Sequence, residues 1–191
     1  AVDTFPDRLE EEPNNTQATA RRVALPVIMN GRIDQPEDTD AFCFDGLAGD
    51  RIVAEVMARR LGSPLDSVLK LTDASGNPVA FNDDHTDRGA GLITHQADSY
   101  LQATLPANGA YCLHLGDAQH KGGSEHAYRL RIGSPRPDFE LRVVPSSISA
   151  RAGKAGRREP DRAVVRTRSR DGQDGVFVGV RVLEHRERRC R

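Results

Sequence analysis

Side chains that carry oxygen gather in two short stretches near the start of the chain. Both stretches combine carboxylates and amides with turn-forming neighbours, and their members are Glu10, Glu12, Asn14, Asn15, Asp38 and Asp40. Oxygen atoms of this kind, roughly six to eight of them, are what Ca²⁺ prefers as ligands. We therefore predict a structural calcium site at which the first stretch meets the second. The rest of the sequence offers no equally good constellation for covalent chemistry.

A second group of oxygen donors follows a predicted strand in the middle of the chain. It consists of Asn82, Asp83 and Asp84, with His85 and Asp87 close behind. Asp and Asn at the end of a strand more often form turns than ligand sites, because their side chains bond to the nearby backbone. This loop is therefore the weaker candidate for a cation.

Zinc ligands of two types also occur in the second half of the chain. They are Cys112, His114, His120 and His126. Their spacing matches no standard zinc pattern, although residues two apart on a strand share a face. We expect surface histidines here, not a metal site.

Residues for a hydrolase triad can be assembled, but no signature accompanies them. The set would draw on Ser63 or Ser99, His85 or His95, and Asp66 or Asp98. No nucleophile elbow surrounds either serine, and a triad is defined by geometry that the sequence does not show. We therefore expect that this chain is not an enzyme.

Charge is distributed unevenly although the whole chain has a formal net charge of −1. Residues 151–191 contain 13 Lys and Arg against 6 Asp and Glu, whereas residues 1–150 contain 14 against 22. Such asymmetry can mark a nucleic-acid-binding tail. The tail lacks interleaved aromatic residues and any nucleic-acid fold motif, so we expect a solvated segment and no nucleic-acid partner.

Cysteine usage and hydropathy bear on the compartment. Cys43 and Cys112 lie in predicted strands, and either a disulfide between them or two free thiols on adjacent strands fits the sequence. No apolar run is long enough to span a membrane. The chain opens without the basic and apolar regions of a signal peptide, so we expect either that a leader has been removed or that this is a piece of a longer protein.

The fold class follows from short apolar segments that alternate with turn-forming residues. Such segments occupy residues 41–44, 51–58, 68–73, 79–84, 99–105, 110–115 and 126–132. Alternation with a period of two indicates strands, and no stretch holds a 3.6-residue period over three turns. We predict an all-β protein, a jelly-roll-like antiparallel β-sandwich, in which Pro26 within residues 23–29 suits a sheet edge or a bend.

The segment order predicts four parts. Residues 1–8 form a lead-in, residues 9–133 the sandwich, and residues 134–138 a linker that contains two prolines. Residues 139–191 start a second, immunoglobulin-like β segment that is partial or truncated. Its last ~40 residues are too few for an independent core without disulfides or metals.

Several of these motifs occur in an order that resembles one family. They are Glu12-Pro13-Asn14-Asn15, Gly31-Arg32-Ile33, residues 38–44, Ala48-Gly49-Asp50, residues 63–69, Asp73-Ala74-Ser75-Gly76, Asn82-Asp83-Asp84 and Gly109-Ala110-Tyr111. Together they resemble the bacterial pre-peptidase C-terminal domain, over about residues 9–133. Residues 98–100, 128–132 and 137–143 resemble the version found in large secreted or surface proteins of planctomycete-type bacteria.

The resemblance implies a non-catalytic jelly-roll sandwich attached to secreted peptidases or repeated in exported proteins. The related collagen-binding domains of collagenases bind Ca²⁺ through the acidic lead-in. This pattern implies the ligands Glu10, Glu12, Asn14, Asn15 and Asp40, with Asp38 or Glu37 as a further donor. Asn15 stands where calcium-binding relatives carry Asp, which implies weaker affinity. Collagen binding is not implied, because no tyrosine-rich surface is evident.

The combined expectation is a calcium-stabilised accessory or binding module. It would be extracellular, periplasmic or on the cell surface, and its partners would be other domains of a larger exported protein. An extracellular polysaccharide or protein is a further partner to consider. The alternative is a carbohydrate- or matrix-protein-binding module with its own ligand surface.

Overall fold

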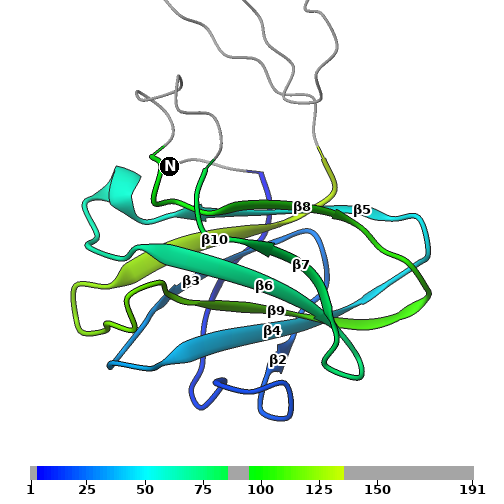
Figure 1. The fold of residues 1–191 in the computed structure, drawn as a ribbon, viewed down its shortest axis with the longest axis horizontal. Helices are drawn as coiled ribbons and strands as arrows, with labels where there is room; N and C mark the ends of the chain where they lie inside the picture. Colours follow the sequence, from blue (N-terminus) through cyan, green and yellow to red (C-terminus); the bar gives the residue numbers. More distant parts are fainter. Residues whose placement is uncertain (1–3, 86–94, 136–191) are drawn as a thin grey trace, which may run out of the picture. The chain divides into compact units, whose positions relative to one another are not determined.

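The computed structural model describes residues 4–85 and 95–135, and within them ten strands form two five-stranded sheets packed face to face (Figure 1). Sheet I contains, in spatial order, β1 (Asp7–Leu9), β3 (Val27–Arg32), β10 (Ala127–Gly133), β5 (Arg51–Met57) and β8 (Tyr100–Thr104). Sheet II contains β2 (Arg21–Arg22), β4 (Thr39–Gly46), β9 (Gly109–Asp117), β6 (Ser67–Asp73) and β7 (Pro78–Asn82). One short 3₁₀ helix, η1 (Arg59–Leu61), follows β5.

The core lies between the sheets because alternate residues of each strand point inward. On β4 the inward residues are Phe42 and Phe44, and on β9 they are Leu113 and Leu115, all of them buried. Sheet I contributes residues such as Leu130. Burial of a large apolar side chain stabilises a fold by about 1.5–3 kcal/mol, so these rows supply the main driving force.

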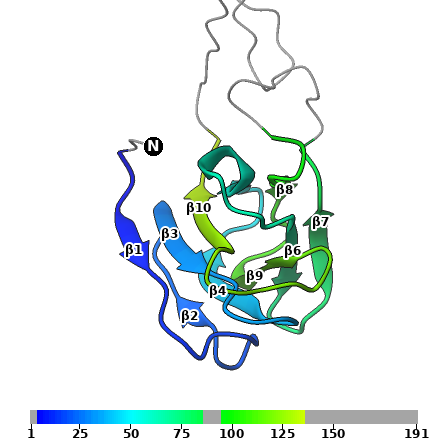
Figure 2. The same cartoon turned by 90° about the vertical axis from the view of Figure 1, so that its left-hand side faces the viewer.

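The predicted all-β sandwich is confirmed, and its central strand pairs are antiparallel as expected. Two pairs at the edges, β1 with β3 and β2 with β4, are parallel. Parallel neighbours need a long connection between them. The connection between β1 and β3 passes along the edge of sheet II as β2 (Figure 2), and the connection between β2 and β4 contains β3.

The start of the chain belongs to the sandwich more closely than a lead-in would suggest. Strand β1 begins at Asp7, and Phe5 before it is buried. Pro26 ends the preceding segment, so β3 begins at Val27. The predicted second β segment and the Arg-rich tail, residues 139–191, lie outside the described residues. No helix among the described residues has the length and apolar character needed to cross a membrane.

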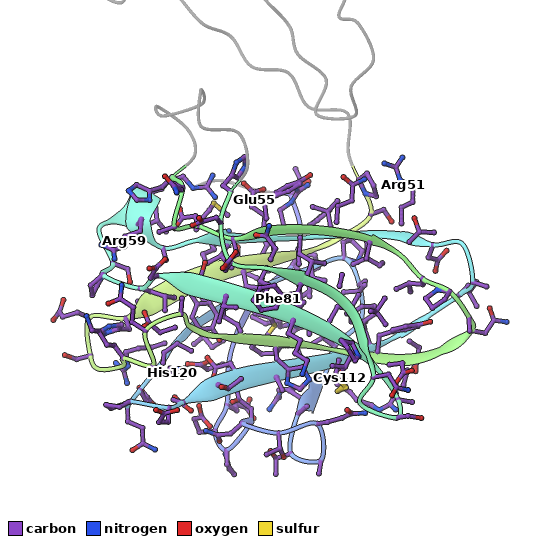
Figure 3. All side chains as sticks on the ribbon, in the orientation of Figure 1. Arg51, Glu55, Arg59, Phe81, Cys112 and His120 are labelled. Atoms are coloured by element: carbon purple, nitrogen blue, oxygen red, sulfur yellow. A yellow bond between two sulfur atoms is a disulfide. The ribbon has the colours of Figure 1, made fainter. Side chains whose placement is uncertain are left out.

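A disulfide joins Cys43 of β4 to Cys112 of β9 (Figure 3), which decides between the two alternatives that the sequence leaves open. The two residues lie directly opposite each other in the antiparallel register. Their separation along the chain is 69 residues. A cross-link over such a distance restricts the unfolded chain strongly and therefore stabilises the folded one.

We expect that replacing both Cys43 and Cys112 with Ala lowers the free energy of unfolding by roughly 4 kcal/mol, from the loop-closure entropy of the unfolded chain. Urea unfolding of the variant and the parent, both carrying Cys190→Ser to prevent exchange with the third cysteine, measures the difference. Reduction of the parent should lower its midpoint to that of the variant. Equal midpoints in oxidised parent and variant would contradict the role of the bond.

Candidate metal-binding site

From here on, the lead-in means residues 5–17. It carries the first group of predicted ligands past the edges of both sheets. The backbone N–H of Glu10 donates to the Asn30 carbonyl of β3 at 3.0 Å. Four residues later, the Asn14 carbonyl accepts from the N–H of Ala41 on β4, also at 3.0 Å. The intervening segment therefore bridges from sheet I to sheet II, and it brings Glu12 between β3 and β4.

Strand β10 reaches across β3 to hold the same lead-in on the outer face of sheet I. The Arg129 guanidinium pairs with the Asp7 carboxylate at 2.7 Å (Nη1 to Oδ1). Two residues on, the Arg131 guanidinium lies over the Phe5 ring, 4.7 Å from its centroid. These contacts fix the approach of the chain to Glu10.

On sheet II, the loop after Asn14 is attached to the turn between β6 and β7. The Gln17 side-chain amide donates to the carbonyls of Asp73 at 3.3 Å and Ala74 at 2.9 Å. The lead-in is thus bonded on both sides of the acidic residues that it carries.

Three of the predicted ligands meet at the junction of the two sheets. One carboxylate oxygen from each of Glu10, Glu12 and Asp40 lies within 4.8 Å of the others. Among the described residues no other group of three His, Cys, Asp or Glu side chains is placed in this way. The oxygen-only composition is suited to a hard cation such as Ca²⁺.

Glu10 is the most firmly held of the three acids. Its Oε1 accepts from the backbone N–H of Arg32 at 2.6 Å, and its Oε2 accepts from the Tyr128 hydroxyl, also at 2.6 Å. The Glu12 carboxylate is more exposed and accepts from the backbone N–H of Asn14 at 2.9 Å. Each oxygen that accepts one hydrogen bond retains a lone pair for a cation.

The side chains of Asp40 and Asn14 lack hydrogen bonds of this kind among the described residues. Both residues are fully buried, at 0% exposure, and within the described part of the chain neither oxygen of Asp40 has a hydrogen-bond partner. The Oδ1 and Nδ2 atoms of Asn14 are also unpartnered. A buried polar group without a partner costs about 1–3 kcal/mol, and a carboxylate costs more. The described residues therefore leave this position short of positive charge.

The pKa values of the site express the same shortage. Burial, followed by the neighbouring Glu10 carboxylate, raises the pKa of Asp40 to about 9. Burial also raises the pKa of Glu12, and the nearby Asp38 and Glu10 charges act in the same direction. The pKa of Tyr128 lies well above its usual value, first because the phenol is buried. All three raised pKa values show that the site disfavours the negatively charged form of each group. A bound cation would favour the charged forms and would lower these pKa values.

Asn15 and Asp38 are turned toward each other. The Asn15 amide donates to Asp38 Oδ1, which also accepts from the N–H of Thr39 at 3.0 Å. Asp38 Oδ2 accepts from the N–H of Asp34 at 2.8 Å. Asp38 thus closes the turn before β4 and acts on the acidic cluster as a nearby charge. Glu37 pairs instead with exposed His120 at 3.3 Å.

The second oxygen-rich loop joins β7 to the segment that leads into β8. The Asn82 side-chain oxygen accepts from the N–H of Tyr100 at 2.8 Å, and Asp84 Oδ2 accepts from the Gln96 amide at 3.2 Å. The ring of His85 lies against that of Tyr100, with centroids 5.4 Å apart. Asp87 lies outside the described residues.

The zinc candidates are dispersed. The Cys112 sulfur is in the disulfide, and His114 shares a hydrogen bond of 3.2 Å with the Thr72 hydroxyl. Burial, followed by Lys70, lowers the pKa of His114, so the ring is neutral at pH 7. His126 closes a turn with Gly123, because its backbone N–H donates to the Gly123 carbonyl.

The triad candidates have structural partners. The Ser63 hydroxyl donates to the Glu125 carbonyl at 3.1 Å, and the Ser99 hydroxyl donates to the Ser67 carbonyl. Within the described residues neither serine hydroxyl bonds to a histidine. His95 accepts from the N–H of Ala97 at 3.1 Å.

Asp98 supports η1 and the loop before β8. It is fully buried, and it accepts from the N–H groups of Ala58, Arg59 and Arg60 at 2.7–3.3 Å. Its Oδ2 also accepts from Arg60 Nε at 2.8 Å. The other candidate acid, Asp66, accepts one bond of 3.3 Å from Gln119.

Two residues at the acidic site, Tyr128 and Gly31, belong to motifs noted in the sequence but were not assigned to this site. On β10, Tyr128 alternates in step with the inward-facing Leu130 and Ile132, so its side chain also points inward. A buried tyrosine hydroxyl usually has a hydrogen-bond partner. That alternation is the one signal that could have identified it. Gly31 lies opposite Tyr128 in the register of β3 and β10. Glycine matters at this position because an added Cβ would meet the Glu10 carboxylate, and the local sequence gives no sign of that proximity.

The fold and the site together define a β-sandwich module with an acid-lined junction between its sheets. The chain is 39% identical, over 107 residues, to a protein of Deinococcus radiodurans named "Probable subtilase-type serine protease". That match covers 54% of this chain and 14% of the relative's length. No family model matches the chain.

The chain is also similar to a solved structure, the pre-peptidase C-terminal domain of a collagenase from Bacillus anthracis. The match covers 64% of this chain and 99% of that domain, with 16% identity and a TM-score of 0.45. A pre-peptidase C-terminal domain is also what the order of motifs in the sequence resembles. At this level of identity no residue role passes from that domain to this chain.

Replacing Asp40 with Asn should raise the free energy of unfolding in a buffer that contains a chelator. The neutral amide removes the cost of protonating or burying a charge beside Glu10, and it keeps the shape of the side chain. Chemical denaturation at neutral pH measures the change. Asp45→Asn, an exposed change on the same strand, should stay within about 0.5 kcal/mol of the parent. A destabilised Asp40→Asn protein in chelator would show that the carboxylate has a favourable partner.

Replacing Asp98 with Ala should lower the free energy of unfolding by about 3–5 kcal/mol, because three N–H groups and the Arg60 guanidinium lose a buried acceptor. Asp66→Ala, at the other candidate acid, should change it by about 0.5 kcal/mol or less. Thermal or urea unfolding measures both. Equal effects of the two substitutions would refute the structural role given to Asp98.

Proposed function

We propose that this chain contains a calcium-stabilised, non-catalytic accessory module of a secreted or cell-surface protein. The observation that carries the proposal is the buried Asp40 carboxylate, unpartnered beside Glu10 and Glu12. The Asn14 side chain, buried and unpartnered as well, adds a neutral oxygen. These donors suit Ca²⁺, which accepts carboxylates and amide carbonyls in irregular arrangements.

The ion would act on stability, not on a reaction. It would supply the positive charge that the acidic residues lack, and it would join Glu10 and Glu12 of the lead-in to Asp40 of β4. Glu10, Glu12, Asp40 and Asn14 would hold it. Asp38 would add to the negative potential without direct contact, since it is not among the three acids whose carboxylate oxygens lie within 4.8 Å of one another.

Two features support an exported setting. The Cys43–Cys112 disulfide is typical of oxidising compartments outside the cytosol. The Deinococcus radiodurans relative carries the name of a subtilase-type serine protease, and this chain matches only 14% of its length. Both suit a module whose partners are other domains of a larger exported protein, a peptidase among them. A separate carbohydrate- or matrix-protein-binding surface stays a prediction.

Calcium should raise the temperature of thermal unfolding relative to chelator. At a free calcium concentration about 100 times the dissociation constant, binding to the folded state alone adds about 2.7 kcal/mol. Asp40→Ala should abolish the response, whereas Asp45→Ala on the same strand should retain it. Calorimetric unfolding of each protein in both buffers measures the difference. A parent protein with the same midpoint in calcium and in chelator would refute the calcium site.

A further inference from the structure

Gly31 occupies a position on β3 where its lack of a side chain is required by the acidic site. An added Cβ would lie 2.5 Å from the Tyr128 hydroxyl oxygen and closer still to Glu10 Oε2. Real Cβ atoms essentially never approach another heavy atom within 3.0 Å. The Glu10 carboxylate therefore lies in the space that any other residue at position 31 would fill.

The backbone does not explain this glycine. The positive-φ glycines of the described chain are Gly49, Gly62, Gly76 and Gly123, and Gly31 is not among them. Gly31 is a regular member of β3, opposite Tyr128 in the antiparallel pair with β10. A larger residue would fit the backbone conformation of a strand. The reason for glycine must therefore be the space above it.

The contents of that space set the position of Glu10. The carboxylate lies over Gly31 between the Tyr128 hydroxyl and the N–H of Arg32, and both of its oxygens accept hydrogen bonds of 2.6 Å. Glu12, by contrast, is exposed and accepts from a neighbour on its own segment. Glu10 is thus the acid of the cluster whose place is determined by residues distant in the sequence.

We propose that Gly31 is a positioning residue for the divalent cation, acting by leaving a slot for the Glu10 carboxylate. This inference rests on the proposed calcium site. With a side chain at position 31, Glu10 would turn away from Tyr128 and toward solvent. The cation would then be left with Glu12, Asp40 and Asn14.

The test is Gly31→Ala, with calcium chloride as the probe in isothermal titration. Loss of a group that orients a metal ligand typically weakens affinity by about 10- to 100-fold, and we expect a loss in that range. In chelator the variant should fold but unfold more easily than the parent, because Glu10 can turn outward whereas the Tyr128 ring, whose hydroxyl oxygen would lie 2.5 Å from the Cβ, has to shift. Gly109→Ala is the matched control, since its Cβ would meet nothing within 4 Å.

A second background distinguishes positioning from a general effect on the strand. Glu10→Asp shortens the side chain by one methylene and withdraws it from the slot. Gly31→Ala should therefore cost several-fold less affinity when added to Glu10→Asp than when added to the parent. Equal losses in both backgrounds, or no loss in either, would overturn the role of Gly31.

The outcomes separate the two proposals. A parent protein that shows no calcium binding refutes the calcium site itself. A parent that binds calcium and a Gly31→Ala variant that binds equally well refute only the slot. If Gly31→Ala folds only together with Glu10→Asp, the contact with Glu10 is still the cause and the proposal stands. If neither Gly31→Ala nor its combination with Glu10→Asp folds, the strand itself requires the glycine and the proposal is wrong.

Discussion

The main electrostatic cost at the junction of the two sheets is the Asp40 carboxylate, which is buried without a hydrogen-bond donor among the described residues. Asp40 is buried at the junction of the two sheets, and the neighbouring charges, on Glu10 and Glu12, have the same sign. Removing such a group from water costs free energy unless a proton or a cation offsets it. The lead-in, β3, β4 and β10 meet at this junction, and their contacts there have to accommodate the buried carboxylate.

The lead-in can meet this requirement because it is bonded at several points outside the acidic cluster. Arg129 and Arg131 hold its beginning on sheet I, and Gln17 holds its end on sheet II. The part between them, which carries Glu10 and Glu12, is therefore short and already aligned with Asp40. A cation at this place would complete an existing arrangement and would order little additional chain.

The sequence predicts the parts of this structure that depend on local pattern. Alternation places Phe42 and Phe44 in the core, and the types and order of the acidic residues indicate that Glu10 and Glu12 act with Asp40. Other features depend on contacts that no local pattern records. The Asn15 amide donates to Asp38 across 23 residues, and the Tyr128 hydroxyl donates to Glu10 across 118 residues. Strands as short as β1 and β2 carry no detectable period, so their parallel pairing could not be predicted.

The same two short strands leave each sheet with one short edge. An open sheet edge presents unpaired N–H and C=O groups that can recruit a strand from another molecule. Here one edge of sheet I ends in the three residues of β1 and one edge of sheet II ends in the two residues of β2. Strand β7 begins with a proline, which cannot donate a hydrogen bond to an incoming strand. These three edges therefore give an incoming strand few consecutive N–H and C=O groups to pair with, whereas the fourth edge is the five-residue strand β8.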